Sequence, residues 1–286
     1  MEFSNSVVDL IKNRVSVRTY KEQKIELEKL KNIKDYLQKL QLENTTEDRY
    51  ELFNMESLSE EDVKQIWKPN VIKGSRYCIA GIYNRKALSE ISFGYDFEKI
   101  ILYLTDLELG TCWLGGAYNR DELEKHLSLK EDEFVSVITP IGYAEDRFRV
   151  LPGAMNLAFR ARNQNRKPWK ILFYHEDPEN HLSEEEAGDY REPLEMVRIG
   201  PSGFNRQPWR VVKQGPRFHF FIGARNTYNF LPHELGKIEI GIAKCHFELT
   251  AKENGLKGTW KEIEKGDLPF ILPNKWNYHT TWIDET

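Results

Sequence analysis

The sequence lacks the features on which disulfide-rich, zinc-binding and membrane-spanning proteins depend. Only three of its 286 residues are cysteines, Cys78, Cys112 and Cys245, and no CxxC pair is present. Thiols that are odd in number and far apart argue against a disulfide framework and a thiolate metal site. No apolar run approaches the roughly 20 residues of a membrane span, and the opening residues form no signal-peptide core. We therefore expect a cytoplasmic protein without a membrane partner.

Charge of one sign is not in excess either. The 41 basic and 45 acidic residues leave a net charge of -4, so the chain has no bulk positive field for nucleic acid, and any anion site must be local. The sequence also contains no GxGxxG, P-loop, GxSxG or HExxH motif. We therefore expect no nucleic-acid partner, no metal centre and no catalytic side-chain nucleophile.

Periodicity predicts both helices and strands. Ser6 predicts the cap of a short first helix. Helical spacing recurs over residues 27–40, and the apolar run at 76–84 predicts a buried strand. Residues 166–174 predict a further short strand that begins near a proline.

The two halves of the chain repeat one order of elements. A shift of 147 residues aligns Trp113 with Trp260 without a gap. The same shift aligns three further identical pairs: Leu109 with Leu256, Leu102 with Leu249, and Gly94 with Gly241. Strands and a long helix recur in the same order around these identities, which indicates a tandem repeat.

We divide the chain into a first repeat over residues 1–174 and a second, shorter repeat over residues 194–286. Residues 175–193 between them, HEDPENHLSEEEAGDYREP, are acidic and contain few large apolar side chains. Dense like charge with few apolar anchors is typical of a mobile connection. We therefore predict an acidic linker that crosses between the repeats.

The stretch RVSVR follows the first helix and is a candidate phosphate site. Arg14, Ser16 and Arg18 share one side of an extended segment, because strand side chains repeat every second residue. Two guanidinium groups and a hydroxyl on one face are able to grip a phosphate through charge-assisted hydrogen bonds. A solvated basic edge strand has the same pattern, and the stretch alone does not separate the two.

The stretch GPSGFNRQPWR, residues 200–210, predicts a polar turn able to hold a flat ligand. Pro201 fixes φ, and Ser202, Asn205 and Gln207 offer polar side chains to neighbouring amides or to a ligand. A turn that merely stops a helix beside a packed tryptophan remains the alternative.

Two further stretches are weaker signals. In GTCWLGG, Leu114, Gly115 and Gly116 allow a backbone to approach a planar ligand, although a helix end followed by a loop glycine pair has the same sequence. In NRKPW, Arg166 and Lys167 add two cations, which also suit an ordinary charged surface.

Taken together, these stretches resemble the nitroreductase family of flavin mononucleotide (FMN) enzymes. The resemblance implies an α+β fold with mainly antiparallel sheets flanked by helices. In the usual member two identical subunits form two sites, each with the arginine segment of one subunit and the Pro-Ser-Asn turn of the other. Here RVSVR occurs only in the first half and the turn only in the second. The chain therefore resembles a tandem branch in which two repeats form a single-chain pseudo-dimer, with further oligomerisation left open.

The resemblance also implies roles for individual residues. The phosphate and polar edge of FMN would be held by Arg14, Ser16, Arg18, Arg166 and Lys167. The ribityl chain and ring would lie against Pro201, Ser202, Asn205 and Gln207, with the backbone of Leu114, Gly115 and Gly116 near the reactive nitrogen. We expect one FMN per chain.

The activity implied is hydride transfer from NADH or NADPH, through the flavin, to a small organic acceptor. The flavin carries that chemistry, and the protein supplies position and charge. Two alternatives stay open at this point: an FMN-binding protein without turnover, in storage or sensing, and a degenerate scaffold without flavin.

Overall fold

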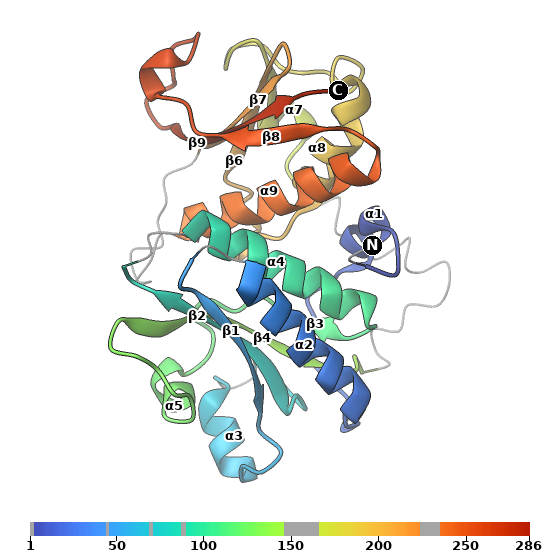
Figure 1. The fold of residues 1–286 in the computed structure, drawn as a ribbon, viewed down its shortest axis with the longest axis vertical. Helices are drawn as coiled ribbons and strands as arrows, with labels where there is room; N and C mark the ends of the chain where they lie inside the picture. Colours follow the sequence, from blue (N-terminus) through green and yellow to red (C-terminus); the bar gives the residue numbers. More distant parts are fainter. Residues whose placement is uncertain (1–2, 44–45, 69–70, 87–89, 146–165, 224–234) are drawn as a thin grey trace.

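The computed structural model describes residues 3–43, 46–68, 71–86, 90–145, 166–223 and 235–286. Two lobes lie one above the other along its long axis, and each contains a sheet with helices packed on it (Figure 1). Among the described residues, no helix combines the length and the apolar character that a bilayer crossing requires.

The helices and strands follow the chain from the lower lobe of Figure 1 to the upper. Residues up to 145 form helices α1 (Val7–Asn13), α2 (Leu27–Glu43), α3 (Glu60–Ile66), α4 (Glu90–Asp106) and α5 (Arg120–Glu124), and strands β1 (Arg49–Asn54), β2 (Tyr77–Asn84), β3 (Gly110–Thr111) and β4 (Glu133–Gly142). Residues from 166 onward form helices α7 (Trp169–Leu172), α8 (Arg191–Ile199) and α9 (Leu235–Glu253), and strands β5 (Phe173–His175), β6 (Trp209–Gln214), β7 (Arg217–Ile222), β8 (Gly258–Lys261) and β9 (Asn277–Asp284). The helix predicted at 27–40 is α2, and the strand predicted at 76–84 is β2.

The two sheets have the same strand order. The first runs β1-β2-β4-β3 and the second β5-β6-β7-β9-β8, so the second repeats the first once β5 is set aside. Neighbouring strands are antiparallel, apart from the parallel pair of β5 and β6. The predicted α+β fold of two tandem repeats is therefore confirmed.

The long helices α4 and α9 pack against each other between the lobes (Figure 1). A Cβ atom on Gly94 would lie 2.2 Å from the carbonyl oxygen of Ile238. Likewise, a Cβ atom on Gly241 would lie 2.1 Å from the carbonyl oxygen of Ile91. Gly94 and Gly241 correspond under the 147-residue shift, so the contact is reciprocal and marks a pseudo-two-fold axis. Glycine is required at both positions because the backbones approach so closely.

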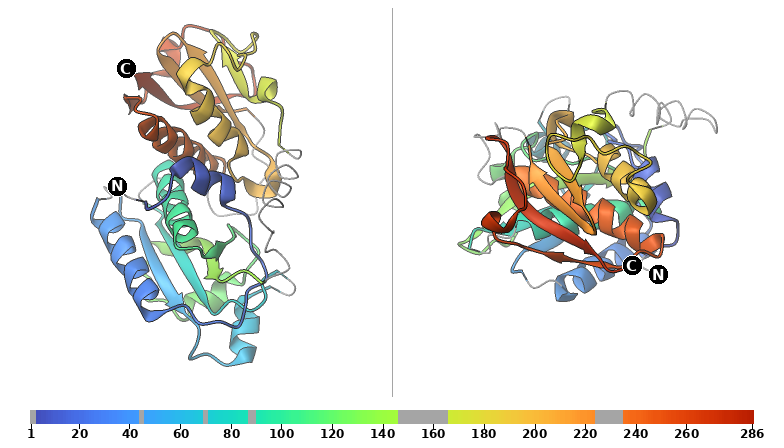
Figure 2. Two further views of the ribbon diagram at one scale, coloured as in Figure 1. Left: turned by 90° about the vertical axis from the view of Figure 1, so that its right-hand side faces the viewer. Right: turned by 90° about the horizontal axis from the view of Figure 1, so that it is seen from above.

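Helix α1 lies at the waist between the lobes (Figure 2, left). Ser6 caps it as predicted, because its hydroxyl accepts from the Asp9 amide. The carboxylate of Glu253, which ends α9, accepts from the Val7 amide at 2.8 Å. The apolar face of α1 packs on residues from both halves: Leu102, Met196, Ile199 and Cys245. The segment that leaves α1 therefore begins at the junction of the two repeats.

The strand predicted at 166–174 is wrong over most of its length. Pro168 precedes the single helical turn α7, and the chain becomes extended only in β5. The indole of Trp169 donates to the Leu182 carbonyl at 2.7 Å, which holds this turn against the following segment. Strand β5 then adds an edge to the second sheet in parallel with β6.

The segment 175–193 differs from the mobile linker that its composition predicts. Leu182, Ala187 and Tyr190 are buried in the core of the second lobe. The Tyr190 hydroxyl also accepts from the Trp282 indole at 3.0 Å. Three spaced apolar anchors thus outweigh the acidic composition and pack the segment on the sheet. The repeat boundaries themselves, 1–174 and 194–286, stay a proposal.

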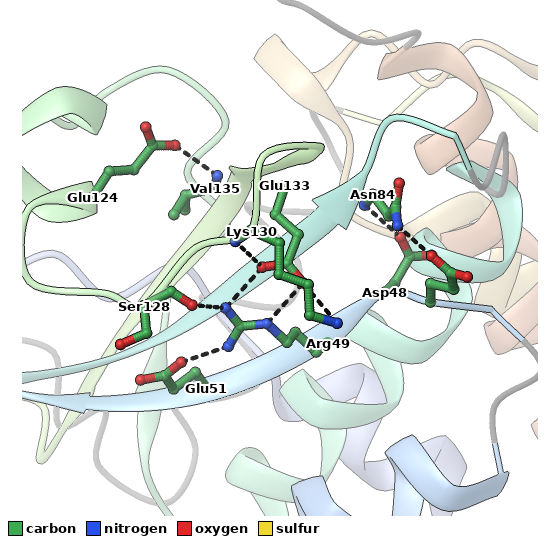
Figure 3. A network of polar contacts seen from close by, with 10 residues as sticks. Asp48, Arg49, Glu51, Asn84, Glu124, Ser128, Lys130, Glu133 and Val135 are labelled. Carbon is green, nitrogen blue, oxygen red and sulfur yellow. Dashed lines mark hydrogen bonds and ion pairs between the residues drawn. The ribbon is translucent and has the colours of Figure 1, made fainter.

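A polar cluster ties strand β1 to the start of β4 (Figure 3). Arg49 donates to the two carboxylate oxygens of Glu133 at 3.1 and 2.9 Å, and to Glu51 at 2.8 Å. It also donates to the Ser128 carbonyl at 2.5 Å. The charges are paired within the cluster, so we interpret it as support for the sheet edge.

The helix crossing predicts the effect of adding one methyl group. Gly94→Ala and Gly241→Ala should each lower the free energy of unfolding by about 2 kcal/mol or more, because the new Cβ atom forces α4 and α9 apart. Gly266→Ala is the matched control, since a Cβ there meets no atom within 4 Å. Urea unfolding would measure all three, and a loss in the control equal to that at the crossing would contradict the close-packing account.

Candidate functional site

The segment RVSVR runs from α1 alongside the short strand β3. Ser16 forms an isolated parallel bridge with Thr111 of that strand. Arg14 is only 3% exposed, whereas Ser16 and Arg18 are exposed, so the predicted shared face is only partly present. Burial raises the pKa of the Cys112 thiol against the lowering effect of all three side chains. The three therefore gather around Cys112, next to GTCWLGG.

The turn at 200–210 follows α8 and is held by its own side chains. Pro201, which opens it, is buried. The Ser202 hydroxyl accepts from the Gln207 amide at 2.9 Å, and the Gln207 side chain donates to Asn205 Oδ1 at 2.8 Å. Three of its residues have positive φ angles: Phe204 at 50°, Asn205 at 56° and Gln207 at 45°. Few residues other than glycine occupy this region, and such strain concentrates at ligand sites.

Two cations that precede α7 meet this turn. Arg166 donates from Nη1 to Asn205 Oδ1 in a close hydrogen bond across 39 residues of sequence. The Lys167 amide donates to Gln207 Oε1 at 2.5 Å, and its ammonium donates to the Gln207 carbonyl at 3.2 Å. The structure therefore brings the predicted cationic run and the predicted turn together.

Positive charge is crowded at this contact. Burial, followed by the charges of Arg14 and Arg198, lowers the pKa of Arg166 to about 10. Its Nε is buried and has no hydrogen-bond partner among the described residues. Burial, followed by Arg210, lowers the pKa of Lys167 to about 8. An anion with several oxygens, such as a phosphate, would stabilise these cations and give the guanidinium donors partners.

Leu114, Gly115 and Gly116 lie just beyond β3. Leu114 is buried, and its backbone N–H and C=O pair with Ile138, both at 2.9 Å. Gly115 is half-buried and Gly116 is exposed, with its carbonyl accepting from Lys68 at 2.7 Å. Among the described residues, no hydrogen bond joins these glycines to the turn, so their predicted role stays a prediction.

Known proteins match this chain across both repeats. The model of the family described as "Putative TM nitroreductase" matches residues 6–251, from the N-cap of α1 to the last turn of α9. The chain belongs to this nitroreductase family. The resemblance predicted from RVSVR and the turn is thereby confirmed, together with the oxidoreductase class that it implied.

One solved structure supports the nitroreductase fold over nearly the whole chain, and others match about half of it. A "putative nitroreductase" from Thermotoga maritima, 19% identical, covers 98% of this chain and 94% of its own with a TM-score of 0.57. A nitroreductase family protein from Clostridium novyi, 21% identical, covers 50% of this chain and 89% of its own with a TM-score of 0.40. A "putative nitroreductase" in complex with FMN from Desulfovibrio desulfuricans, 18% identical, covers 49% and 87% with a TM-score of 0.40. No curated protein matches the chain.

A buried carboxylate that sequence reasoning missed joins three segments of the candidate site. Glu98 of α4 is fully buried. Its Oε2 accepts from the Trp113 indole at 2.6 Å. Its Oε1 lies 2.8 Å from Nε2 of His246 on α9 and 4.0 Å from Nε of Arg14. Glu98 therefore links RVSVR, GTCWLGG and the second repeat.

The protons in this network follow from its partners. Nδ1 of His246 lies 2.9 Å from the Met196 carbonyl, which can only accept, so Nδ1 carries a proton. The contact between His246 Nε2 and Glu98 then needs one more proton, which either partner is able to hold. Both arrangements leave the pair neutral as a whole, so the positive charge of Arg14 is not cancelled.

The network exists on one side of the pseudo-two-fold axis. The 147-residue shift places Cys245 opposite Glu98 and Lys99 opposite His246. Glu98 and His246 each lie on the apolar face of a long helix, where a polar residue is unexpected. This was the feature of the sequence that could have identified them as functional candidates. Their contact could not be foreseen, because 148 residues separate them.

A second missed residue, Glu239, fixes the turn to the start of α9. It is 1% exposed, and its Oε1 accepts from the Gly203 amide at 2.6 Å. Burial raises the pKa of Glu239 to about 8, against the lowering effects of the Gly203 hydrogen bond, Arg206 and Lys167. A buried carboxyl group with a pKa near neutrality, next to a turn that is a candidate ligand site, is a candidate acid–base group.

We expect Glu98→Leu to destabilise the fold, because it leaves the buried Trp113 indole N–H and His246 Nε2 without the partner that Glu98 supplies. Leaving buried polar groups unpaired typically costs about 1–3 kcal/mol for each group. Glu248→Leu is the matched control, since Glu248 accepts from the Trp260 indole as Glu98 does from Trp113, but is less buried. We expect a loss below about 1 kcal/mol there. Equal losses in urea unfolding would rule out a special role for Glu98.

Glu239 predicts a pH dependence of stability. Between its ordinary pKa of 4.5 and the folded-state value of about 8, the unfolded chain releases the proton while the folded chain keeps it. This group therefore makes the free energy of unfolding fall as pH rises through that window, by up to about 5 kcal/mol. Glu239→Gln should remove the effect, so the variant gains on the wild type between pH 5 and pH 8. Parallel stability curves for the two proteins would count against the raised pKa.

Proposed function

We propose that the chain is an FMN-dependent NAD(P)H oxidoreductase that holds one FMN between its two repeats and reduces a small organic acceptor. The hydrogen bond between Arg166 and Asn205 carries this proposal, because it joins the cations before α7 to the turn of the second repeat. Membership of the nitroreductase family supports the reaction class.

The donor set suits the phosphate of FMN. Arg166 has a buried Nε without a partner among the described residues, and the charges of Arg14 and Arg198 crowd it. Ser16 and Arg18 are exposed nearby in RVSVR, where a hydroxyl and a guanidinium would reach further oxygens. With Lys167, these groups would hold the phosphate and the polar edge of the flavin.

The turn suits the ribityl chain and the ring. Ser202 and Gln207 fix its shape by their mutual hydrogen bond, and Asn205 is exposed at its tip. A turn ordered before the ligand arrives loses little conformational entropy on binding. Pro201 would pack beside the ring, and the backbone of Leu114, Gly115 and Gly116 would face the reactive nitrogen.

When bound, FMN would supply hydride transfer from NADH or NADPH to the acceptor. Arg14 and Arg18 would stabilise negative charge that develops at the polar edge, since the Glu98–His246 pair leaves the charge of Arg14 uncancelled. Glu239 is able to hold a proton at neutral pH, and that proton belongs on Oε2 because Oε1 accepts from Gly203.

A single FMN is expected because the opposite side lacks the same groups. In chain order, residues 44–48 between α2 and β1 correspond to the turn between α8 and β6, and they contain no proline, serine or glycine. Cys245 and Lys99 replace the Glu98–His246 pair there. At about 1 kcal/mol or more for each lost hydrogen bond, the affinity of that side should be lower by orders of magnitude.

The test is the flavin content of the purified protein after saturation with FMN and gel filtration. We expect a ratio near one FMN per chain, measured by absorbance against amino-acid analysis, and loss of the yellow colour on anaerobic addition of NADH or NADPH. A ratio near two would overturn the one-site proposal. Yellow protein that neither cofactor bleaches would favour an FMN-binding protein without turnover, and failure to bind FMN would favour a scaffold.

A pair of variants locates the binding. Arg166→Leu should weaken FMN binding by about 10- to 100-fold, since it removes charge-assisted hydrogen bonds. Arg191→Leu, which removes an exposed arginine paired with Glu184, is the control and should leave the affinity within threefold of the wild type. Unchanged affinity in the first variant would refute the assignment of Arg166.

A further inference from the structure

A cavity of about 340 Å³ opens where α2, α4, α9 and β8 meet. Its lining mixes charged, polar and apolar side chains: Leu40, Glu43, Ser92, Tyr95, Asp96, Lys99, Lys244, Glu248 and Trp260. A volume of this size lies in the range of small-molecule sites. None of the groups assigned to FMN lines it.

The cavity is the pseudo-symmetric counterpart of the FMN side. The 147-residue shift relates its residues to those of the other side: Trp260 to Trp113, Lys244 to Phe97, Lys99 to His246, and Ser92 to Glu239. The geometry is preserved at one pair, because Phe97 and Trp113 have ring centroids 4.7 Å apart and the ammonium of Lys244 lies 4.7 Å from the Trp260 centroid. The position has thus been kept while its chemistry has changed.

The acidic residues of the cavity already have partners. Each carboxylate accepts or pairs within the chain: Glu248 with Lys252 at 2.5 Å and with the Trp260 indole at 2.8 Å, Asp96 with the Tyr50 hydroxyl at 3.4 Å, and Glu43 with Lys39 at 3.8 Å. Their negative charge is therefore at least partly satisfied before any ligand enters.

Lys244 differs from these acids. Its ammonium lies over the Trp260 ring and makes no hydrogen bond or ion pair with any described residue. Burial lowers its pKa, against the raising effects of Glu248 and Glu262. A half-buried ammonium with donors to spare is a natural partner for a ligand anion.

We propose that this cavity binds a small organic carboxylate, with its anionic group on Lys244 and its apolar body against Trp260, Tyr95 and Leu40. A monoanion suits the site better than a phosphate, because the lining contains no arginine and its three carboxylates would repel a dianion. The absence of arginine from the lining also argues against a second FMN at this cavity. The proposal concerns a site apart from the FMN side and does not depend on turnover.

The test is a titration of the FMN-saturated protein with 4-fluorobenzoate, followed by fluorine NMR. We expect saturable binding that Lys244→Met weakens at least tenfold and that Lys244→Arg keeps within threefold. Lys261→Met, which removes the exposed lysine next to Trp260 in sequence, should leave the dissociation constant unchanged. The neutral 4-fluorobenzamide should bind at least tenfold more weakly than the carboxylate.

Other outcomes would overturn the proposal. Absence of saturable binding would show that the cavity is not a carboxylate site. Equal affinity of the wild type and Lys244→Met would show that the probe binds elsewhere, for example at the proposed FMN site. Binding of 4-fluorophenyl phosphate as tight as that of the carboxylate would overturn the assignment of ligand class. Unchanged thermal unfolding and FMN content in Lys244→Met would establish that the variant is folded, so that its weaker binding reports on the cavity.

Discussion

The close crossing of α4 and α9 is the constraint on which the rest of the structure depends. Gly94 and Gly241 let each helix approach the carbonyl groups of the other, and this sets the distance between the two lobes. One helical turn further along, that short distance brings Glu98 within 2.8 Å of His246. A wider crossing would separate this pair and leave two buried polar side chains without their partner. The proposed FMN site, formed by RVSVR, Arg166, Lys167 and the turn at 200–210, is therefore positioned by helix packing before any ligand contact is considered.

Because the repeats are duplicated within one chain, the two sides of this crossing are able to have different residues. In a homodimer every interface contact occurs twice, whereas here the two repeats have separate sequences. On one side α1, Glu98 and His246 form a buried and proton-sharing junction. On the other side Cys245 and Lys99 occupy the related positions, and Lys244 replaces Phe97 beside the retained tryptophan. The pseudo-two-fold axis thus relates positions in space but not their chemistry.

The sequence predicted features that depend on neighbouring residues or on an exact repeat. The Ser6 cap, strand β2 and the 147-residue shift are of this kind, and each is found in the structure. The parallel pairing of β5 and the packing of residues 175–193 were missed, because both depend on contacts with the second sheet. The composition of residues 175–193 correctly indicated an acidic surface, but it did not indicate that Leu182, Ala187 and Tyr190 are buried.

The candidate site shows the same division. The family resemblance pointed to Arg166 and Asn205, and the structure joins them. It gave no reason to select Glu98 or Glu239, since an isolated acid in a long helix is usually solvated. Both matter here only because another segment covers them: Trp113 and His246 in one case and the Gly203 amide in the other. Burial of this kind is a property of the assembled fold.

The features of the proposed FMN site share one energetic property, which is that each destabilises the folded chain. The site holds cations close together, keeps three residues other than glycine at positive φ, and buries a carboxyl group with a raised pKa. Each of these features lowers the stability of the folded chain on its own, and proteins retain such features chiefly at functional sites. A phosphate would relieve the cation crowding but would not relax the turn or lower the pKa of Glu239. Anion binding should therefore offset only part of the loss in the free energy of unfolding that these features cause. The strained turn and Glu239 must be held in place by the packing of the helices beneath them.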